Sequence, residues 1–166
     1  LNEYIITDLK NKKAPIDCFG VGTELTTSKD EPSLNGVYKL VAIKQYSKAT
    51  NKYETFYKMK TSVNKISYPC PKQIFRFEKN NYFIKDILAL EEERIENANP
   101  LLLQYIKDGQ LIQKLPNLFE IKKYHQKQIA SLHKRFKKIN HIEVKYPVLL
   151  SPKLTKIMKE LEKERV

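Results

Sequence analysis

The sequence predicts an α+β fold, and three observations support that prediction. Apolar residues recur every three or four positions near both ends of the chain, which is typical of amphipathic helices. Between them lie runs of aromatic and β-branched residues separated by polar turns, which is typical of antiparallel strands. The chain has 166 residues, of which 41% are hydrophobic, enough for a packed core. We expect three segments: a unit of helix and strand at 1–36, a strand-rich module at 37–113, and helices with a short strand at 114–166.

The first segment is expected to hold one helix and one buried strand. Its apolar positions are spaced for one face of a helix over residues 1–12. The run at 16–19 is short and mostly apolar, as in a buried parallel strand, so Cys18 is expected to be a small core residue. A helix, a loop and a buried strand form half of a repeating α/β unit. Such a strand needs neighbouring strands on both sides, and the later residues supply no second unit of this kind.

Two antiparallel hairpins are expected in the middle segment, each with two strands around a polar turn. The first hairpin has strands at 37–46 and 53–60, and the second has strands at 73–78 and 82–90. An acidic loop at 91–99 follows the second hairpin. Its run of three glutamates lacks a partner base, so we expect these carboxylates to be solvated.

The last segment is expected to hold two helices and one short strand. Apolar residues at helical spacing run over 117–139, with lysines on the other face, and Asn117 stands where an N-cap belongs. The extended run at 144–150 contains a proline, which suits an edge strand. A serine followed by Pro152 then begins the final helix.

The chain is strongly basic, with 31 basic and 19 acidic residues and a formal net charge of +12. This surplus favours anionic partners, so one interpretation is a nucleic-acid surface centred on the lysines at 122–138. The other interpretation is that these lysines are solvated faces of helices and strands. The second is favoured, because only four basic residues are arginines and the lysine face has almost no aromatic side chains on which bases could stack.

A glycine loop follows the first expected strand and has the clearest chemistry of the chain. It consists of Gly20, Val21, Gly22 and Thr23. Two glycines permit positive φ and a close approach of backbone N–H groups to a ligand, and the Thr23 hydroxyl adds a donor. At the carboxyl end of a barrel strand, such a loop suits a phosphate group. The alternative is a tight turn without a ligand.

Other residue types that perform chemistry form no recognisable catalytic or metal site. The histidines His125, His133 and His141 are too far apart to bring a pair onto one helical turn. We expect His125 to be partly buried on an apolar helix face and the other two to lie on the surface. No Gly-x-Ser-x-Gly element for a serine nucleophile occurs in the sequence.

The cysteines and the hydropathy pattern indicate in which cellular compartment the protein is expected. Cys18 and Cys70 are the two cysteines, far apart in sequence, which excludes a disulfide-dense secreted scaffold and a four-cysteine zinc site. No apolar run approaches the ~20 residues of a membrane span, and no leader of charged and then apolar residues opens the chain. We therefore expect a soluble protein of the cytoplasm that has no membrane partner.

Several stretches closely resemble the nicotinate phosphoribosyltransferase family. The specific ones are Ile-Asp-Cys-Phe-Gly-Val-Gly-Thr at 16–23, Thr-Ser at 27–28 and Pro-Ser-Leu-Asn-Gly-Val-Tyr-Lys-Leu-Val at 32–41, and the supporting ones lie at 65–77, 115–121 and 146–152. The resemblance covers nearly the whole chain but only the C-terminal part of such an enzyme. The fold that it implies is the end of a type II phosphoribosyltransferase-like α/β barrel enzyme: the last βα unit of the barrel, an antiparallel β module and C-terminal helices.

The sequence departs from the family pattern at two places. Asn35 stands where the family usually has a second glycine, so the turn before Gly36 is expected to differ. Cys70 and Pro71 replace an expected Gly-Lys pair, which removes a flexible residue and a positive charge. Neither change touches the glycine loop.

The resemblance implies an enzyme that forms nicotinate mononucleotide, an NAD precursor, from nicotinate and phosphoribosyl pyrophosphate, with hydrolysis of ATP in the presence of Mg²⁺. It implies that the glycine loop contacts the sugar phosphate, that the enzyme is a homodimer, and that a phosphorylated histidine lies on an upstream part of the barrel. We expect this chain alone to bind neither ATP nor Mg²⁺ and to be inactive without the rest of the enzyme. The alternatives are a basic nucleic-acid-binding module and a structural module.

Overall fold

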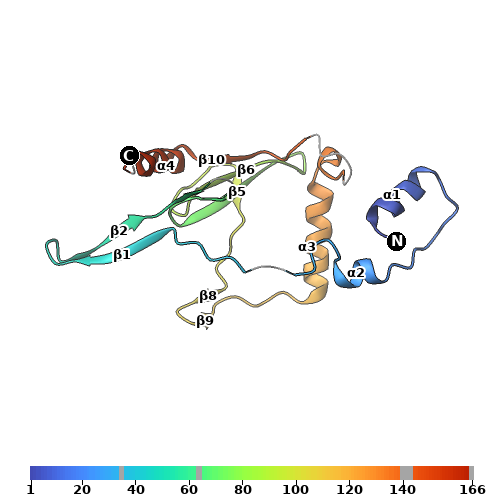
Figure 1. Cartoon of the computed structure of the whole chain (residues 1–166), viewed down its shortest axis with the longest axis horizontal. Helices are drawn as coiled ribbons and strands as arrows, with labels where there is room; N and C mark the ends of the chain where they lie inside the picture. Colours follow the sequence, from blue (N-terminus) through green and yellow to red (C-terminus); the bar gives the residue numbers. More distant parts are fainter. Residues whose placement is uncertain (34–35, 63–64, 139–143, 165–166) are drawn as a thin grey trace. The chain divides into compact units, whose positions relative to one another are not determined.

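The computed structural model describes residues 1–33, 36–62, 65–138 and 144–164, with helices and strands in the order drawn in Figure 1. These residues form two compact units. The first is built on Leu1–Tyr38, and the second is built on Lys39–Lys137 and Val144–Val166. Mixed helices and strands confirm the coarse α+β prediction.

The first unit contains the predicted N-terminal helix, α1 (Glu3–Asn11), and a short helix, α2 (Thr23–Thr27). The side chain of Asn2 caps α1, because its oxygen accepts a hydrogen bond from the backbone N–H of Ile5 at 3.0 Å. This cap satisfies one of the four N–H groups that the first turn of a helix leaves without a partner. The helix prediction for residues 1–12 is confirmed.

The buried strand predicted at 16–19 is wrong for this chain. Residues 16–19 form no strand, the Ile16 side chain is 43% exposed, and Cys18 is exposed instead of lying in a core. The physical reason is that a strand buried on both faces needs hydrogen-bonded neighbours on both edges. The described residues offer this run no such neighbours, so its backbone stays irregular.

The second unit is built around a four-stranded sheet with the order β10-β6-β5-β7 (Figure 1). Its strands are β5 (Lys72–Lys79), β6 (Tyr82–Leu90), β7 (Ala98–Pro100) and β10 (Val148–Leu150). Strands β5 and β6 are the predicted second hairpin, and β10 is the predicted edge strand, parallel to β6. Strand β7 pairs with β5 and takes the last two positions of the loop expected at 91–99.

Three further two-stranded pairs complete the strands of the second unit. They are β1 (Ala42–Ser47) with β2 (Lys52–Tyr57), β3 (Lys60–Ser62) with β4 (Lys65–Ser67), and β8 (Ile106–Lys107) with β9 (Gln110–Leu111). The first pair confirms the predicted hairpin around a turn, although its strands are shorter than expected. Beyond Tyr57, the N–H groups of Lys58 and Cys70 both donate to the carbonyl of Val41.

The long C-terminal helix ends earlier than the sequence predicts. Helix α3 (Leu118–Ser131) begins at the predicted cap, where Asn117 and Glu120 form a reciprocal capping box. It ends because Leu132 is extended, and a short 3₁₀-helix, η1 (Lys134–Phe136), follows. The turn brings His133 against Tyr82, with ring centres 5.6 Å apart. Residues 139–143, the end of the predicted helix, lie outside the described residues.

The core of the second unit lies between the sheet and the last helix, α4 (Pro152–Lys163). Cys70, Leu90 and Leu154 form its buried centre, and all three are at most 5% exposed. The Ser151 hydroxyl caps α4 by accepting from the N–H of Leu154 at 3.1 Å. The helix therefore starts where the sequence predicts, and its apolar face covers the sheet.

One glutamate of the acidic run is structural rather than solvated, which corrects the sequence-based expectation. A single carboxylate oxygen of Glu93 accepts from the N–H of Leu90 at 2.8 Å and from the Ser151 hydroxyl at 2.7 Å. The side chain thus joins the end of β6 to the start of α4. Glu91 and Glu92 are exposed, as expected.

The two cysteines are expected to differ sharply in reactivity. Cys18 is exposed, whereas Cys70 is 1% exposed and burial raises the pKa of its thiol. Ellman's reagent should modify one thiol per native chain at once and the second only after denaturation. Cys18→Ser should remove the fast reaction. Equal rates at both thiols in the native chain would contradict the burial of Cys70.

Candidate functional site

The glycine loop lies in the first unit, directly before α2, and does not adopt the conformation that two glycines permit. Neither Gly20 nor Gly22 has a positive φ; Gly22 has φ −96° and ψ −109°. No atom lies within 4 Å of a Cβ built on either glycine, so neither is required by crowding. The loop therefore does not use the positive φ that its glycines permit.

The glycine loop has hydrogen-bond donors at the start of α2. Gly22 is the N-cap of α2, and its carbonyl accepts from the N–H groups of Leu25 at 3.1 Å and Thr26 at 3.0 Å. The N–H groups before these stand at the open start of a helix, where the helix itself supplies no acceptor. Thr23 is exposed, and within the described residues its hydroxyl makes no hydrogen bond. The loop thus offers backbone and hydroxyl donors to an anion.

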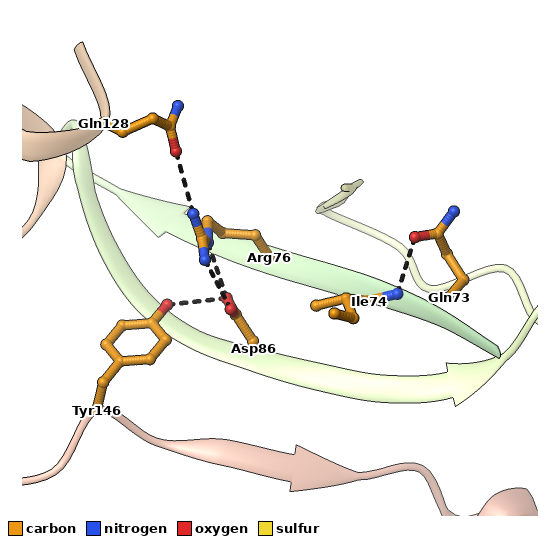
Figure 2. A network of polar contacts seen from close by, with 6 residues as sticks. All are labelled: Gln73, Ile74, Arg76, Asp86, Gln128 and Tyr146. Carbon is orange, nitrogen blue, oxygen red and sulfur yellow. Dashed lines mark hydrogen bonds and ion pairs between the residues drawn. The ribbon is translucent and has the colours of Figure 1, made fainter. Parts of the chain in front are cut away.

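A second polar cluster, the Arg76 network, lies in the second unit and was not predicted as a unit (Figure 2). Arg76 on β5 faces Asp86 on β6, and two guanidinium nitrogens donate to the two carboxylate oxygens at 2.9 and 2.8 Å. The Tyr146 hydroxyl donates to the same carboxylate at 2.9 Å. The third contact runs from Arg76 to the side-chain oxygen of Gln128 on α3, at 3.1 Å.

Aromatic rings surround the Arg76 network and strengthen it. The guanidinium carbon of Arg76 lies 4.4 Å from the ring centre of Phe83 and 6.0 Å from that of Tyr146. The Asp86 side chain is 9% exposed and the Arg76 side chain 21% exposed. The hydrogen bond to Asp86 raises the pKa of Arg76 above its usual value, although burial opposes the shift.

The Arg76 network is structural, because its charged and polar atoms satisfy one another. It joins β5, β6, α3 and the segment that leads into β10. None of its groups is left as a free acid, base or nucleophile. One local signal for this network exists, since Arg76 alone interrupts the apolar run at 74–77. Asp86 and Gln128 lie 10 and 52 positions from Arg76, and Tyr146 lies 60 positions from Asp86, too far for local patterns to reveal.

Tyr146 is expected to make stability fall at high pH. Burial, followed by the hydrogen bond to Asp86, raises the pKa of Tyr146 from 10.0 to about 12. The folded protein keeps a phenol proton that the unfolded chain has lost, so the free energy of unfolding should decrease as the pH rises from 10.0 to about 12. Below that range Tyr146 should not contribute to the pH dependence of the free energy of unfolding.

Denaturant titrations of Tyr146→Phe and the parent chain across this pH range test the effect. The variant should lose part of the decrease, whereas Tyr53→Phe, which removes a hydroxyl from a residue 71% exposed, should not. An identical decrease in Tyr146→Phe and the parent would contradict a buried phenol.

The loop at 68–71 contains one of the two departures from the family pattern, Cys70 with Pro71. Cys70, where a glycine is expected, has a positive φ of 68°, the conformation that glycine adopts most readily. The Lys72 ammonium donates to the carbonyls of Tyr68, Pro69 and Cys70, at 2.8, 3.2 and 2.5 Å. Burial lowers the pKa of Lys72. Lys72 therefore stabilises its own loop. The other departure from the family pattern, Asn35, lies outside the described residues.

The histidines and lysines do not gather into a site. His125 is exposed, not partly buried as expected, because the apolar face of α3 is itself largely uncovered. His133 is half-buried, and its ring nitrogen Nδ1 accepts from the N–H of Arg135 at 3.3 Å; His141 lies outside the described residues. Across the ranges that the structure covers, no three histidine, cysteine or acidic side chains cluster as metal ligands.

The lysines of α3 are exposed, as a solvated helix face would be. Among the helices within the described ranges, none is both long and apolar enough to cross a membrane.

Comparisons with known proteins confirm the predicted resemblance. Residues 94–158 match the family described as the nicotinate phosphoribosyltransferase C-terminal domain. The nicotinate phosphoribosyltransferase of Caenorhabditis elegans is 34% identical over 82% of this chain and 28% of the relative. That of Bacillus subtilis is 31% identical over 91% of this chain and 35% of the relative. The chain therefore spans about a third of the length of these relatives.

A solved structure supports the fold. The crystal structure of human nicotinic acid phosphoribosyltransferase matches 66% of this chain and 27% of that chain, with a TM-score of 0.53 and 21% identity. At this identity the match shows a shared fold.

Proposed function

Because the chain is related to the C-terminal part of the nicotinate phosphoribosyltransferase family, we propose that it is the C-terminal part of such an enzyme. The enzyme would act in the cytoplasm as a homodimer. It would join nicotinate to the ribose 5-phosphate of phosphoribosyl pyrophosphate, release pyrophosphate and hydrolyse ATP. The observation that supports this most directly is the similarity to the Bacillus subtilis relative over 91% of the chain.

The proposed contribution of this chain to the reaction is to hold the substrate phosphate. Gly20, Val21, Gly22 and Thr23 would contact the 5-phosphate through backbone N–H groups and the Thr23 hydroxyl. Gly20, Gly22 and Thr23 are exposed, and Gly22 and Thr23 stand at the start of α2, which supports the assignment. They perform no bond chemistry. They hold the phosphate so that the ribose C1 faces the nicotinate nitrogen, and such positioning contributes as much as ~7–11 kcal/mol in favourable intramolecular reactions.

The proposed loop conformation depends on the rest of the enzyme. We propose that α1 and the run at 16–19 form the last βα unit of a barrel whose other units are not in this chain. Neighbouring strands would then supply the backbone partners that residues 16–19 lack here. This proposal accounts for an apolar run that is exposed in the chain by itself.

ATP and Mg²⁺ are proposed to bind outside this chain. The described residues bring no suitable set of carboxylates together, and Glu93 is already engaged by Leu90 and Ser151. No step proposed for this chain passes through the metal or the nucleotide.

Thr23→Ala is expected to weaken phosphate binding about tenfold, because one hydrogen bond to a charged group contributes ~1.5–3 kcal/mol. The chain should be titrated with ribose 5-phosphate while the amide signals of residues 20–23 are followed by nuclear magnetic resonance. Thr7→Ala is the matched control, since the Thr7 hydroxyl donates within α1 to the carbonyl of Glu3. Shifts that spare the glycine loop, or that Thr23→Ala leaves unchanged, would refute the assignment.

The same variants separate this function from nucleic-acid binding by the lysines of α3. Binding through those lysines should weaken steeply as salt rises, and Thr23→Ala should not affect it.

A further inference from the structure

An apolar groove in the second unit has no partner within the described residues. We call it the α3 groove. It is a cavity of about 530 Å³ between the segment after β7 and the first half of α3. Its apolar lining includes Leu101, Leu102, Leu103, Tyr105, Ile121 and Tyr124.

The side chains of the α3 groove are far more exposed than apolar side chains of a packed helix. Leu103 is 60% exposed, Ile121 49% and Tyr124 61%. Helix α3 has no buried residue at all, and its contact with the Arg76 network is made near its other end, by Gln128. A contiguous apolar surface of this kind marks an interaction site, because an amphipathic helix is stabilised mainly by packing of its apolar face.

The length of the relatives and the charge of this chain indicate what covers the α3 groove. The relatives from Caenorhabditis elegans and Bacillus subtilis match this chain over 28% and 35% of their length, so most of each polypeptide lies outside the match. The groove itself lies within residues 94–158, which match the family. A second copy of this chain would bring another net charge of +12, and like charges repel.

We infer that the α3 groove is the surface on which the remaining part of the nicotinate phosphoribosyltransferase polypeptide packs, through an apolar segment. Besides its apolar side chains, the groove is lined by Pro116 and Glu120. Apolar side chains of the occupant would fill the cavity. This inference rests on the proposed function, because that function supplies the missing polypeptide.

The test compares cysteine reactivity in the 166-residue chain and in a fusion polypeptide. In the fusion, this chain replaces the matching part of the Bacillus subtilis relative. With Cys18→Ser as background, Tyr124→Cys reports on the groove. Phe119→Cys is the matched control, because Phe119 lies on the same helix, is 82% exposed and does not line the groove. Modification by a maleimide is followed by peptide mass spectrometry.

Tyr124→Cys should react at least tenfold more slowly in the fusion than in the chain alone, whereas Phe119→Cys should react at similar rates in both. Adding Ile121→Asp, which places a charge in the groove, should restore the reactivity of Tyr124→Cys in the fusion. Exposure of Ile121 in the chain alone makes its folding tolerant of this change, and circular dichroism verifies it.

Three results would overturn the inference. Equal reactivity of Tyr124→Cys in both polypeptides would show that the rest of the enzyme leaves the groove open. Protection in the chain alone that grows with its concentration would assign the groove to a second copy. Protection of Tyr124→Cys in the chain alone at every concentration would assign the groove to residues 1–38 of the same chain.

A different result separates this inference from the proposed function. Protection of Tyr124→Cys in a fusion that forms no nicotinate mononucleotide would refute the proposed function while leaving this surface an interface.

Discussion

Asp86→Ala is expected to lower the free energy of unfolding of the chain by about 3 kcal/mol, because removing one partner of a buried ion pair costs ~3–5 kcal/mol. The variant would leave the Arg76 guanidinium without its two carboxylate contacts and the Tyr146 hydroxyl without its acceptor. We place the effect at the low end of that range because the Arg76 side chain is 21% exposed and water can reach it. Urea denaturation followed by circular dichroism measures the change.

An exposed ion pair provides the control for Asp86→Ala. Asp8 and Lys12 lie 2.7 Å apart on α1, but their side chains are 57% and 70% exposed, so Asp8→Ala should cost at most ~1 kcal/mol. A double-mutant cycle of Asp86→Ala with Tyr146→Phe should show coupling, because both remove the same hydrogen bond. Equal costs for Asp86→Ala and Asp8→Ala would show that the Arg76 network adds little to stability.

Local signals in the sequence predicted many of the elements correctly. The hairpin of β5 and β6 follows from two aromatic and β-branched runs around Asn80 and Asn81, and both asparagines adopt the positive φ that such a turn requires. The starts of α3 and α4 follow from Asn117 and Ser151, whose side chains accept hydrogen bonds from N–H groups three residues later. In each case the residues that determine the turn or the helix start lie within a few positions of it, so the local sequence pattern is enough to predict it.

Features that depend on distant residues could not be predicted in this way. The Arg76 network joins residues from β5, β6, α3 and the segment before β10, and no spacing rule connects them. The apolar face of α3 has the period of a packed helix, yet it is largely exposed in the part of the chain that the structure describes. The run at 16–19 has the composition of a buried strand but no neighbours. The composition of these segments thus predicted burial against neighbouring elements, which the described residues do not provide.

The glycine loop also combines features that local residues determine with features that depend on distant residues. The sequence indicated a donor-rich loop at the end of a strand, whereas the structure has Gly22 as the N-cap of α2 and Thr23 exposed. Neither glycine uses the positive φ that it permits. The proposal therefore predicts that the loop binds phosphate weakly in this chain and more tightly beside the rest of the barrel.

The formation of nicotinate mononucleotide is expected to be absent from this chain alone and restored by the fusion polypeptide. By the proposed function, the groups that stabilise the leaving pyrophosphate and the oxocarbenium-like ribose lie in the rest of the enzyme. Within the fusion, Thr23→Ala should raise the KM for phosphoribosyl pyrophosphate about tenfold, by loss of one hydrogen bond to a charged group worth ~1.5–3 kcal/mol. Thr7→Ala should leave it unchanged.

The central measurement is the rate at which nicotinate mononucleotide appears from nicotinate, phosphoribosyl pyrophosphate and ATP, compared between the purified 166-residue chain, the truncated Bacillus subtilis relative and their fusion. We predict no turnover by either part alone and clear turnover by the fusion. Turnover by the 166-residue chain alone, or a folded fusion that forms no product, would contradict the account.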